Sequence, residues 1–260
     1  MNNKQDIQSL PDQRNVLIDK VGVKGVRYPV IVDDKANRTQ QTIADFDIYV
    51  QLPHDHRGTH MSRFLEVLNE YHKDSIIENL ENFLKEVKSR LNAEASFVNI
   101  RFPYFVKRKA PVSGIESLLD YNCFFEASYR DDYDLIIGIV VPVTTLCPCS
   151  KEISENGAHN QRSHITVRVR FDEFVWLEDL IAMADDSSSC ELYPLLKRVD
   201  EKYVTEKAFS RPRFVEDIVR EMALKLRADK RITGFKVESE NFESIHNHSA
   251  YAYVEENFKR

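Results

Sequence analysis

The segment LCPCSKEISENGAHNQRSH, residues 146–164, holds side chains whose types and spacing could do chemistry. Cys147 and Cys149 are separated only by Pro148, and they follow residues 135–145, an apolar run that predicts a buried strand. If the backbone stays extended past that strand, both thiols project to the same side. A disulfide across a single residue would be strained, so binding a metal as thiolate suits the pair better than redox exchange.

Two histidines follow the cysteines in the same segment. His159 and His164 are close enough in the sequence to join Cys147 as metal ligands. The spacing matches no standard zinc-finger pattern, because the chain has no second cysteine pair. A surface loop with incidental cysteines therefore stays open as an alternative to a metal site.

Another histidine pair lies near the C-terminus, in SIHNHSAYAYV. The alternation predicts a strand over residues 246–255, with His246 and His248 on one face and the small Ala250 and Ala252 leaving room for a ligand. Imidazoles transfer protons near neutral pH. Two half-exposed strand histidines are the alternative, but together with the cysteine segment the pair favours an enzyme over a binding module.

Two glutamates have ordinary structural explanations. Glu216 lies in SRPRFVEDIVREM, where Ser210 predicts a helix N-cap, Pro212 falls in the first turn, and an acidic residue favours the helix dipole. Glu201 lies in KRVDEKYVTEK, which is typical of a solvated cluster of charges. The residues alone single out neither glutamate.

Composition bounds the class of protein. The chain has 260 residues, 42% of them hydrophobic, so it can bury a substantial core. A net charge of −6 without a basic stripe gives no support to nucleic-acid binding. No apolar run is long enough to cross a membrane, the N-terminus is not a secretory signal, and four cysteines make no disulfide scaffold. We therefore expect a cytoplasmic protein without membrane or nucleic-acid partners.

The order of expected elements is the same in both halves of the chain. Residues 23–34 predict a first strand, and residues 44–52 alternate like a half-buried second strand. A pair of helices is expected next, and residues 76–91 carry the apolar stripe of the second one. Further strands are expected at residues 96–106, 122–129, 135–145, 165–171, 232–240 and 246–255, and further helices at residues 175–184 and 213–227. Because the strands come in pairs and glycines are few, an antiparallel α+β fold is favoured over a parallel sheet.

Three separated motifs carry a family resemblance. GTHMSRF, LCPCSKEIS with GAHNQRSH, and ESIHNHSAYAYVE together resemble the prokaryotic type IB GTP cyclohydrolases, and they occur in the order that this family shows. The resemblance runs from about Asp19 to the C-terminus. Three motifs with matching local sequence are specific evidence, whereas one alone would not be.

The resemblance implies a fold and an assembly. The expected fold is α+β, a bimodular tunnelling fold of two ββααββ units, with antiparallel sheets and helix pairs on one side. Residues 1–20 would form an irregular arm, residues 21–132 the first module, and residues 133–260 a second module carrying most of the metal site. The family implies a homotetramer with active sites at subunit interfaces.

The resemblance also implies a reaction and a metal centre. The expected enzyme is GTP cyclohydrolase I, a hydrolase acting on cyclic amidines, which converts GTP and water to formate and 7,8-dihydroneopterin triphosphate for folate and pterin biosynthesis. By resemblance, Cys147, His159 and Glu201 are the metal ligands, with a position left open for water. This mixed set suits one divalent Zn²⁺, Mn²⁺ or Fe²⁺ per site, and no organic cofactor is expected.

The remaining site residues are assigned by the same resemblance. Glu216 resembles the residue that anchors the guanine, since a carboxylate can accept two parallel hydrogen bonds from the ring N–H and the amino group. His246, His248 and Cys149 are the candidate catalytic groups beside Cys147, with the histidines moving protons.

Two alternatives stay open. An Fe²⁺-dependent archaeal-type relative gives a cyclic phosphate product, and the motifs shared by both branches do not separate the two outputs. A non-catalytic protein of the same fold that binds a metal or a purine is the alternative from another class.

Overall fold

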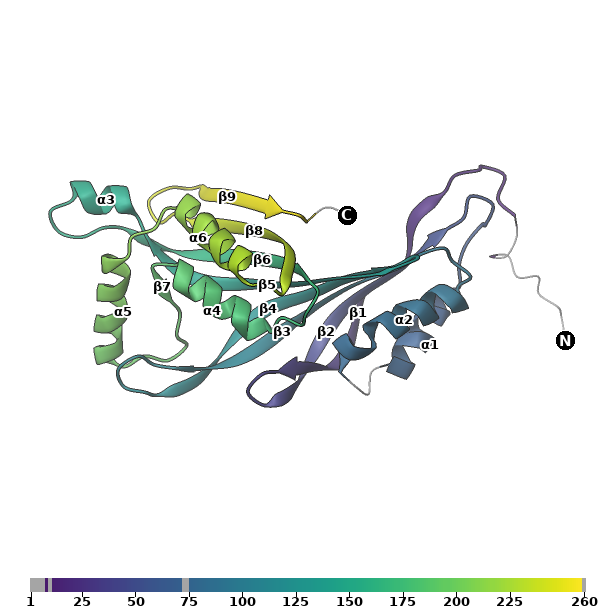
Figure 1. Cartoon of the computed structure of the whole chain (residues 1–260), viewed down its shortest axis with the longest axis horizontal. Coiled ribbons are helices and arrows are strands. Elements are labelled where there is room, and N and C mark those ends of the chain that lie inside the picture. The colour runs from purple at the N-terminus through teal and green to yellow at the C-terminus, as the bar shows by residue number, and fades with distance from the viewer. Residues whose placement is uncertain (1–7, 9–10, 72–74, 259–260) are drawn as a thin grey trace. The chain divides into compact units, whose positions relative to one another are not determined.

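The computed structural model describes residues 8, 11–71 and 75–258 of the chain (Figure 1). In this part of the chain one sheet of nine strands has the order β1-β2-β3-β4-β5-β6-β8-β9, with β7 paired to β5. The strands are β1 (Ile18–Asp34), β2 (Arg38–Leu52), β3 (Ser96–Lys109), β4 (Glu116–Tyr129), β5 (Tyr133–Leu146), β6 (Asn160–Phe171), β7 (Cys190–Glu191), β8 (Ile232–Phe242) and β9 (Ser249–Glu256). The helices are α1 (Met61–Tyr71), α2 (Ile76–Arg90), α3 (Pro148–Ile153), α4 (Leu177–Ser187), α5 (Arg198–Ser210) and α6 (Val215–Ala228).

The expected bimodular tunnelling fold of two ββααββ units is wrong. The strands belong to one antiparallel sheet, in which β4 and β5 are neighbours, rather than to one sheet in each half. Pairing these strands removes two sheet edges whose backbone groups would otherwise be left without partners. The helices expected at residues 175–184 and 213–227 are confirmed as α4 and α6, but α3, the short β7 and α5 were not expected.

The chain forms two compact units. Unit 1 comprises Met1–Pro103 and Phe124–Ile136, and unit 2 comprises Tyr104–Cys123 and Ile137–Arg260. Residues 1–7, 9 and 10 of the expected N-terminal arm lie outside the described residues, and β1 already begins at Ile18. The expected boundaries at residues 20 and 132 stay a prediction. Every predicted site residue falls in unit 2.

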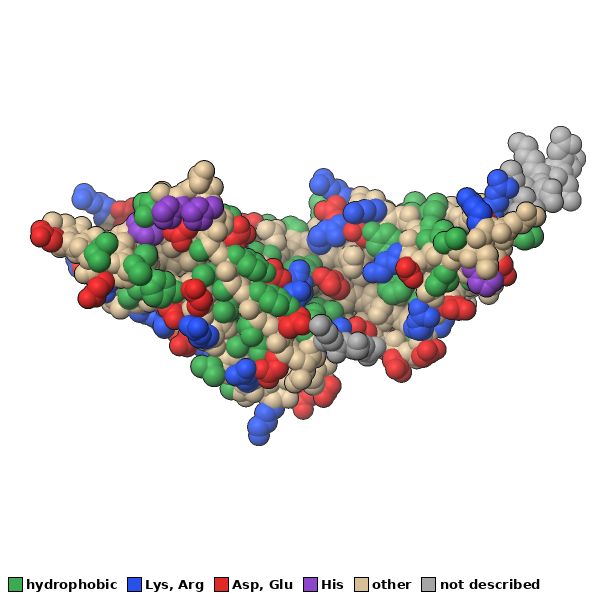
Figure 2. Space-filling model, turned by 90° about the horizontal axis from the view of Figure 1, so that it is seen from above, with side chains coloured by type: hydrophobic (Ala, Val, Ile, Leu, Met, Phe, Trp, Pro, Cys, Tyr) green, Lys and Arg blue, Asp and Glu red, His purple; other side chains and the backbone are tan. Residues whose placement is uncertain are grey.

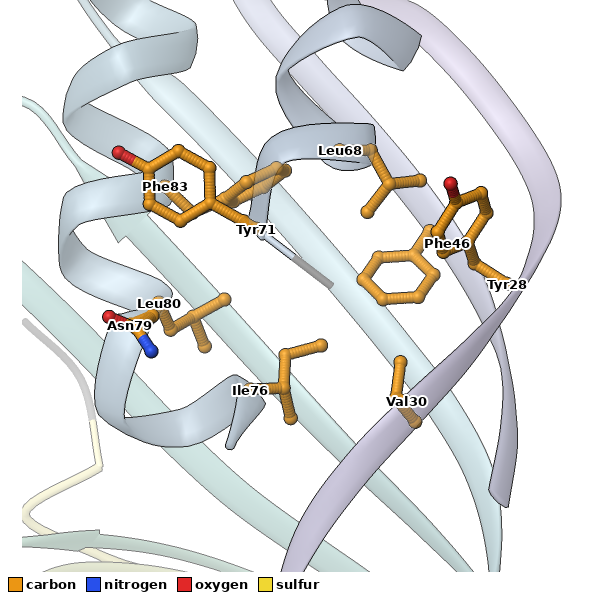
Figure 3. A pocket seen from close by; sticks show the side chains of 9 residues that line it. All are labelled: Tyr28, Val30, Phe46, Leu68, Tyr71, Ile76, Asn79, Leu80 and Phe83. Carbon is orange, nitrogen blue, oxygen red and sulfur yellow. The ribbon is translucent and has the colours of Figure 1, made fainter. Parts of the chain in front are cut away.

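Unit 1 buries the alternating face of β2 that the sequence predicts. Its apolar side chains are at most 5% exposed: Ala44, Phe46, Ile48, Val50 and Leu52. Helices α1 and α2 cover this region, and a cavity of about 20 Å³ remains where Phe46 faces Leu68 and Leu80 (Figure 3). A space of that size holds about one water molecule, so it is a packing gap and not a binding site.

Unit 2 buries the alternating face of β6 together with helices α4 and α6. Ile165, Val167 and Val169 are fully buried, as the sequence pattern predicts. The helices contribute buried residues at helical spacing, among them Leu180 in α4 and Met222 in α6. Polar side chains contact one another beside this core, where β5 ends and β6 begins. Across the described residues, no helix is long and apolar enough to span a membrane.

His164 is a partly buried titratable group in β6. Its ring packs edge-on against Phe242, with 4.8 Å between the ring centroids. Burial lowers the pKa of His164, and the charge of Arg162 lowers it further, against a smaller opposite effect of Glu240. The folded protein therefore favours the neutral imidazole more than the unfolded chain does.

This shift predicts a pH dependence of stability. As the pH falls through about 6.5, the usual pKa of histidine, the unfolded chain takes up a proton at residue 164 before the folded protein does. The free energy of unfolding should therefore fall more steeply between pH 7 and pH 5.5 in the unmodified protein than in His164→Gln. Urea unfolding at both pH values measures this, and equal losses in the two proteins would contradict it.

Candidate active site

Cys147 and His159 meet where the pairing of β5 with β6 ends. The last pair of the ladder is Leu146 with Asn160. One step further, the Cys147 N–H donates to the His159 carbonyl oxygen at 3.1 Å. The antiparallel register therefore brings a thiol and an imidazole of the predicted metal site onto adjacent backbone positions.

Ser150 hydrogen-bonds to both residues of this Cys147–His159 corner. Its N–H donates to Cys147 Sγ at 3.4 Å, and its hydroxyl donates to the Cys147 carbonyl oxygen at 3.2 Å. The same hydroxyl oxygen accepts from the His159 N–H at 3.2 Å. Ser150 therefore bonds to both of the predicted ligand residues that meet here.

The backbone does not stay extended past β5, so the expected projection of both thiols to one side of a strand is wrong. Pro148 occupies the first turn of α3, where its fixed φ and missing N–H are favourable, and Cys147 becomes the N-cap. Cys149 lies in the helix and is exposed, whereas Cys147 is half-buried. The two thiols therefore do not extend from one strand, and only Cys147 belongs to the corner with His159.

A buried polar chain orients the imidazole of His159. Its Nδ1 lies 3.1 Å from Gln161 Oε1, while Gln161 Nε2 donates to Thr145 Oγ1 at 2.9 Å. Thr145 in turn shares a hydrogen bond of 2.7 Å with Ser163. When Nδ1–H of His159 donates to Gln161 Oε1, the lone pair of a neutral imidazole lies on Nε2. Metal-binding histidines are commonly held by such a partner on the other ring nitrogen.

The connection between β8 and β9 lies beside the same imidazole. Ser244 Oγ is 3.5 Å and a Glu243 carboxylate oxygen 4.0 Å from His159 Nδ1. The side chains of His159 and Glu243 are mostly buried, at 16% and 14% exposed. Residues from β5, β6 and the β8–β9 connection therefore converge at one place.

His246 and His248 lie in this connection and not in a strand. The expected strand start at residue 246 is wrong, because β9 begins at Ser249 and residues 243–248 form the turn. The two exposed rings are stacked, with 4.9 Å between their centroids and 12° between their planes. Figure 2 shows histidine side chains gathered on this part of the surface of unit 2.

Glu201 and its neighbour Asp200 have opposite surroundings in the first turn of α5. Asp200 is fully buried, and one of its oxygens accepts from the Lys197 N–H at 2.9 Å. Glu201 is exposed, and its carboxylate has no hydrogen bond or ion pair to any other residue that the structure describes. The helix cap is supplied by Asp200, so the carboxylate of Glu201 is left available.

The same division occurs in the first turn of α6. Asp217 accepts from the Phe214 N–H at 2.9 Å, whereas Glu216 is exposed and has no partner in the described ranges. Ser210 is not the N-cap that the sequence analysis expected, because it ends α5 and Phe214 caps α6. Helix capping therefore accounts for the acidic residue at position 217 but not for the one at position 216.

A cavity of about 260 Å³ lies between these elements. Thr144 of β5 and Asn160 of β6 line it beside the Cys147–His159 corner, and Val204 and Thr205 line it from α5. Glu201 precedes Val204 and Thr205 by three and four residues, so it shares a face of α5 with them, although it does not itself line the cavity.

The structure brings some predicted site residues together and leaves others apart. Cys147 and His159 are in contact through their backbones, and the connection carrying His246 and His248 adjoins them. Over residues 8, 11–71 and 75–258, no three Cys, His, Asp or Glu side chains form a group that could hold a metal ion. Glu201 therefore does not form one group with the other two predicted ligands in this structure.

Gln161 and Ser163 are functional residues that the sequence motifs do not single out. The alternation that runs through β6 extends back to both positions, and they are 7% and 0% exposed. Two polar residues on the core-facing side of a strand are a signal of a buried hydrogen-bond network. The polar residues in this alternation could therefore have indicated the hydrogen-bonded chain that orients His159.

Comparison with known proteins shows which family the chain belongs to. A family model described as "Type I GTP cyclohydrolase folE2" matches residues 5–252. The chain belongs to this family. It is 56% identical over 260 residues to "GTP cyclohydrolase FolE2" of Magnetococcus marinus, covering 98% of each chain. It is 52% identical over 259 residues to the protein of the same name from Geobacter metallireducens, covering 100% of this chain and 99% of that one.

Solved structures share the fold at much lower identity. A urate oxidase from Bacillus sp. TB-90 aligns with a TM-score of 0.54 at 9% identity, over 92% of this chain and 99% of that one. A hyper-thermostable mutant of AgUricase aligns with a TM-score of 0.51 at 10% identity, over 94% of each chain. At such identities the likeness concerns the fold alone.

The contrast between Glu216 and Asp217 gives a test. Asp217→Ala removes the capping bond to Phe214 and should lower the free energy of unfolding by about 1 kcal/mol. Glu216→Ala removes an exposed side chain without a partner and should change it by no more than about 0.5 kcal/mol. Urea denaturation of both variants measures the difference. A larger loss from Glu216→Ala than from Asp217→Ala would contradict this assignment of the cap.

Proposed function

We propose that this protein is a GTP cyclohydrolase I, which opens the imidazole ring of guanine in GTP and yields formate and 7,8-dihydroneopterin triphosphate for folate and pterin biosynthesis. Family membership over residues 5–252 supports an enzyme that acts on GTP. The observation that carries the site is the Cys147–His159 corner, where an oriented imidazole adjoins a thiol that accepts an N–H bond.

The corner fits a divalent metal ion. Sulfur from Cys147, nitrogen from His159 and oxygen from Glu201 form a mixed donor set that suits Zn²⁺, Mn²⁺ or Fe²⁺. The polar chain behind His159 Nδ1 and the uncommitted carboxylate of Glu201 support this assignment. When bound, the metal supplies a Lewis acid and lowers the pKa of a coordinated water. No organic cofactor is required for this chemistry.

Glu216 is the proposed anchor of the guanine. Its carboxylate is exposed and has no partner among the residues that the structure describes, while Asp217 takes the capping role beside it. The two oxygens can accept the guanine ring N–H and amino group in parallel. A base without these donors would leave the carboxylate desolvated and unpaired, which disfavours its binding.

His246 and His248 are the proposed proton carriers. Ring opening, loss of formate and closure of the new ring each require a proton to be delivered or removed. The stacked imidazoles lie in the connection that reaches His159, so they adjoin the proposed site. Cys149, exposed in α3, is the proposed further group for proton movement.

The proposed assembly is a homotetramer with active sites at subunit interfaces, in the cytoplasm. Two observations support a shared site. Glu216, His246 and His248 are all exposed in the single chain. No group of three metal-binding side chains forms within the described part of one chain.

The activity is tested with the full chain, loaded anaerobically with Zn²⁺, Mn²⁺ or Fe²⁺ and incubated with GTP. We expect formate together with a pterin triphosphate, detected by its fluorescence after oxidation. Cys147→Ala should lower kcat by at least about 1000-fold, since removing a metal ligand removes the activation of water. Glu206→Gln, at the exposed side of α5, should keep full activity. Formation of a cyclic phosphate would indicate the archaeal-type reaction, and absence of turnover with all three metals would contradict the proposal.

The role of Glu216 makes a separate prediction. Glu216→Gln keeps the size of the side chain but replaces one acceptor oxygen by a donor, so one of the two bonds to guanine becomes repulsive. We expect kcat/KM for GTP to fall by about 100-fold, which matches the loss of one charged hydrogen bond. Metal content, measured by elemental analysis, should stay unchanged. An unaltered kcat/KM would exclude Glu216 as the anchor.

A further inference from the structure

Helix α5 is held in place by polar contacts and not by a hydrophobic face. Only two of its side chains, Asp200 and Ala208, are buried, and Val199 and Tyr203 are 53% and 42% exposed. Amphipathic helices are normally positioned by burying an apolar stripe, which this helix lacks. The position of α5 therefore depends on the hydrogen bonds and ion pairs that its residues make.

Asp200 makes the most complete set of these contacts. One carboxylate oxygen accepts from the Val112 and Ser113 N–H groups, each at 2.8 Å. The other accepts from the Ser113 hydroxyl at 2.6 Å and from the Lys197 N–H at 2.9 Å. Each oxygen thus receives two donors, and the carboxylate is fully buried. Such a charge is stable inside the protein because it is fully hydrogen-bonded.

Three of the four donors come from the turn between β3 and β4, which is itself closed by hydrogen bonds. The Ala110 N–H donates to the Ile115 carbonyl at 2.9 Å, and the Gly114 N–H donates to the Ala110 carbonyl at 3.2 Å. Gly114 has φ +70°, a conformation that glycine adopts without strain. Asp200 therefore binds a preformed turn and fastens the first turn of α5 to it.

Other polar contacts hold the C-terminal part of α5. Lys207 Nζ lies 2.5 Å from Glu191 of β7, and Lys151 of α3 donates to the Phe209 carbonyl at 2.6 Å. These contacts lie about two turns away from Asp200 along the helix. Loss of the Asp200 contacts would therefore loosen the first turn while the other end stays attached.

We propose that Asp200 is a positioning residue for the metal ligand Glu201. Adjacent helical residues share one stretch of backbone, so fixing Asp200 against the β3–β4 turn fixes the origin and direction of the Glu201 side chain. The carboxylate of Glu201 makes no bond of its own in the described structure. Its position therefore depends on the backbone that the contacts of Asp200 hold in place. This inference rests on the proposed function, because it requires Glu201 to be a ligand.

The test measures metal affinity and not activity alone. Metal-free full-length protein is titrated with Zn²⁺ and with Mn²⁺ in competition with a chelator. We expect Asp200→Ala to weaken binding by 10- to 100-fold, which is the usual effect of losing a group that orients a ligand. Asp200→Asn and Ser113→Ala each keep part of the contacts and should weaken binding less. At saturating metal, kcat should recover in all three variants.

Lys207→Gln is the matched control. It breaks a polar contact of the same helix at the other end, so it should lower the thermal midpoint with at most a twofold change in metal affinity. If Lys207→Gln weakened metal binding as much as Asp200→Ala, general loosening of α5 would replace positioning as the explanation. Should Asp200→Ala fail to fold, the graded order of Asp200→Asn and Ser113→Ala carries the same test.

Glu201→Gln separates this inference from the proposed function. If Glu201→Gln loses the metal while the Asp200 and Ser113 variants stay within twofold of the unmodified protein, the positioning role is overturned and the metal site stands. If Glu201→Gln binds metal normally, the ligand assignment fails, and with it the role of Asp200. The expected result is a graded loss of metal affinity: Ser113→Ala loses least, Asp200→Ala loses more, and Glu201→Gln binds the metal most weakly.

Discussion

The backbone bond from Cys147 to His159 is the constraint on which the rest of the site depends. It continues the β5–β6 register one step past the ladder, and so it brings two side chains from different strands to one corner. Ser150 then binds both residues, and the chain of Gln161, Thr145 and Ser163 behind the imidazole is buried against the same two strands. The ends of two paired strands hold donor atoms more reproducibly than a free loop would.

Paired acidic residues at helix starts supply the other side chains of the proposed site. In both α5 and α6 an aspartate accepts the backbone N–H of the N-cap residue, and the carboxylate of the adjacent glutamate has no bond to another residue of the described ranges. A helix start needs its N–H groups satisfied, but one carboxylate suffices for the cap. The second carboxylate is thereby available for a ligand without loss of helix stability.

The fold itself says little about the chemistry. The same arrangement of strands and helices occurs in urate oxidases that share about a tenth of their residues with this chain. Membership of the GTP cyclohydrolase family is shown by the sequence instead, over residues 5–252. Function therefore follows from the residues placed at the β5–β6 corner, on the first turns of α5 and α6 and in the β8–β9 connection.

The sequence by itself determined the family, the candidate residues and the alternating faces of β2 and β6, because these depend on local pattern and residue type. It could not determine that one sheet unites the strands, since strand pairing across the chain is set by long-range contacts. Nor could it reveal α5, whose only buried residues are Asp200 and Ala208, or tell which acidic residue caps each helix. Those outcomes depend on which donors the tertiary structure places within reach of each carboxylate, and no local pattern encodes that distance.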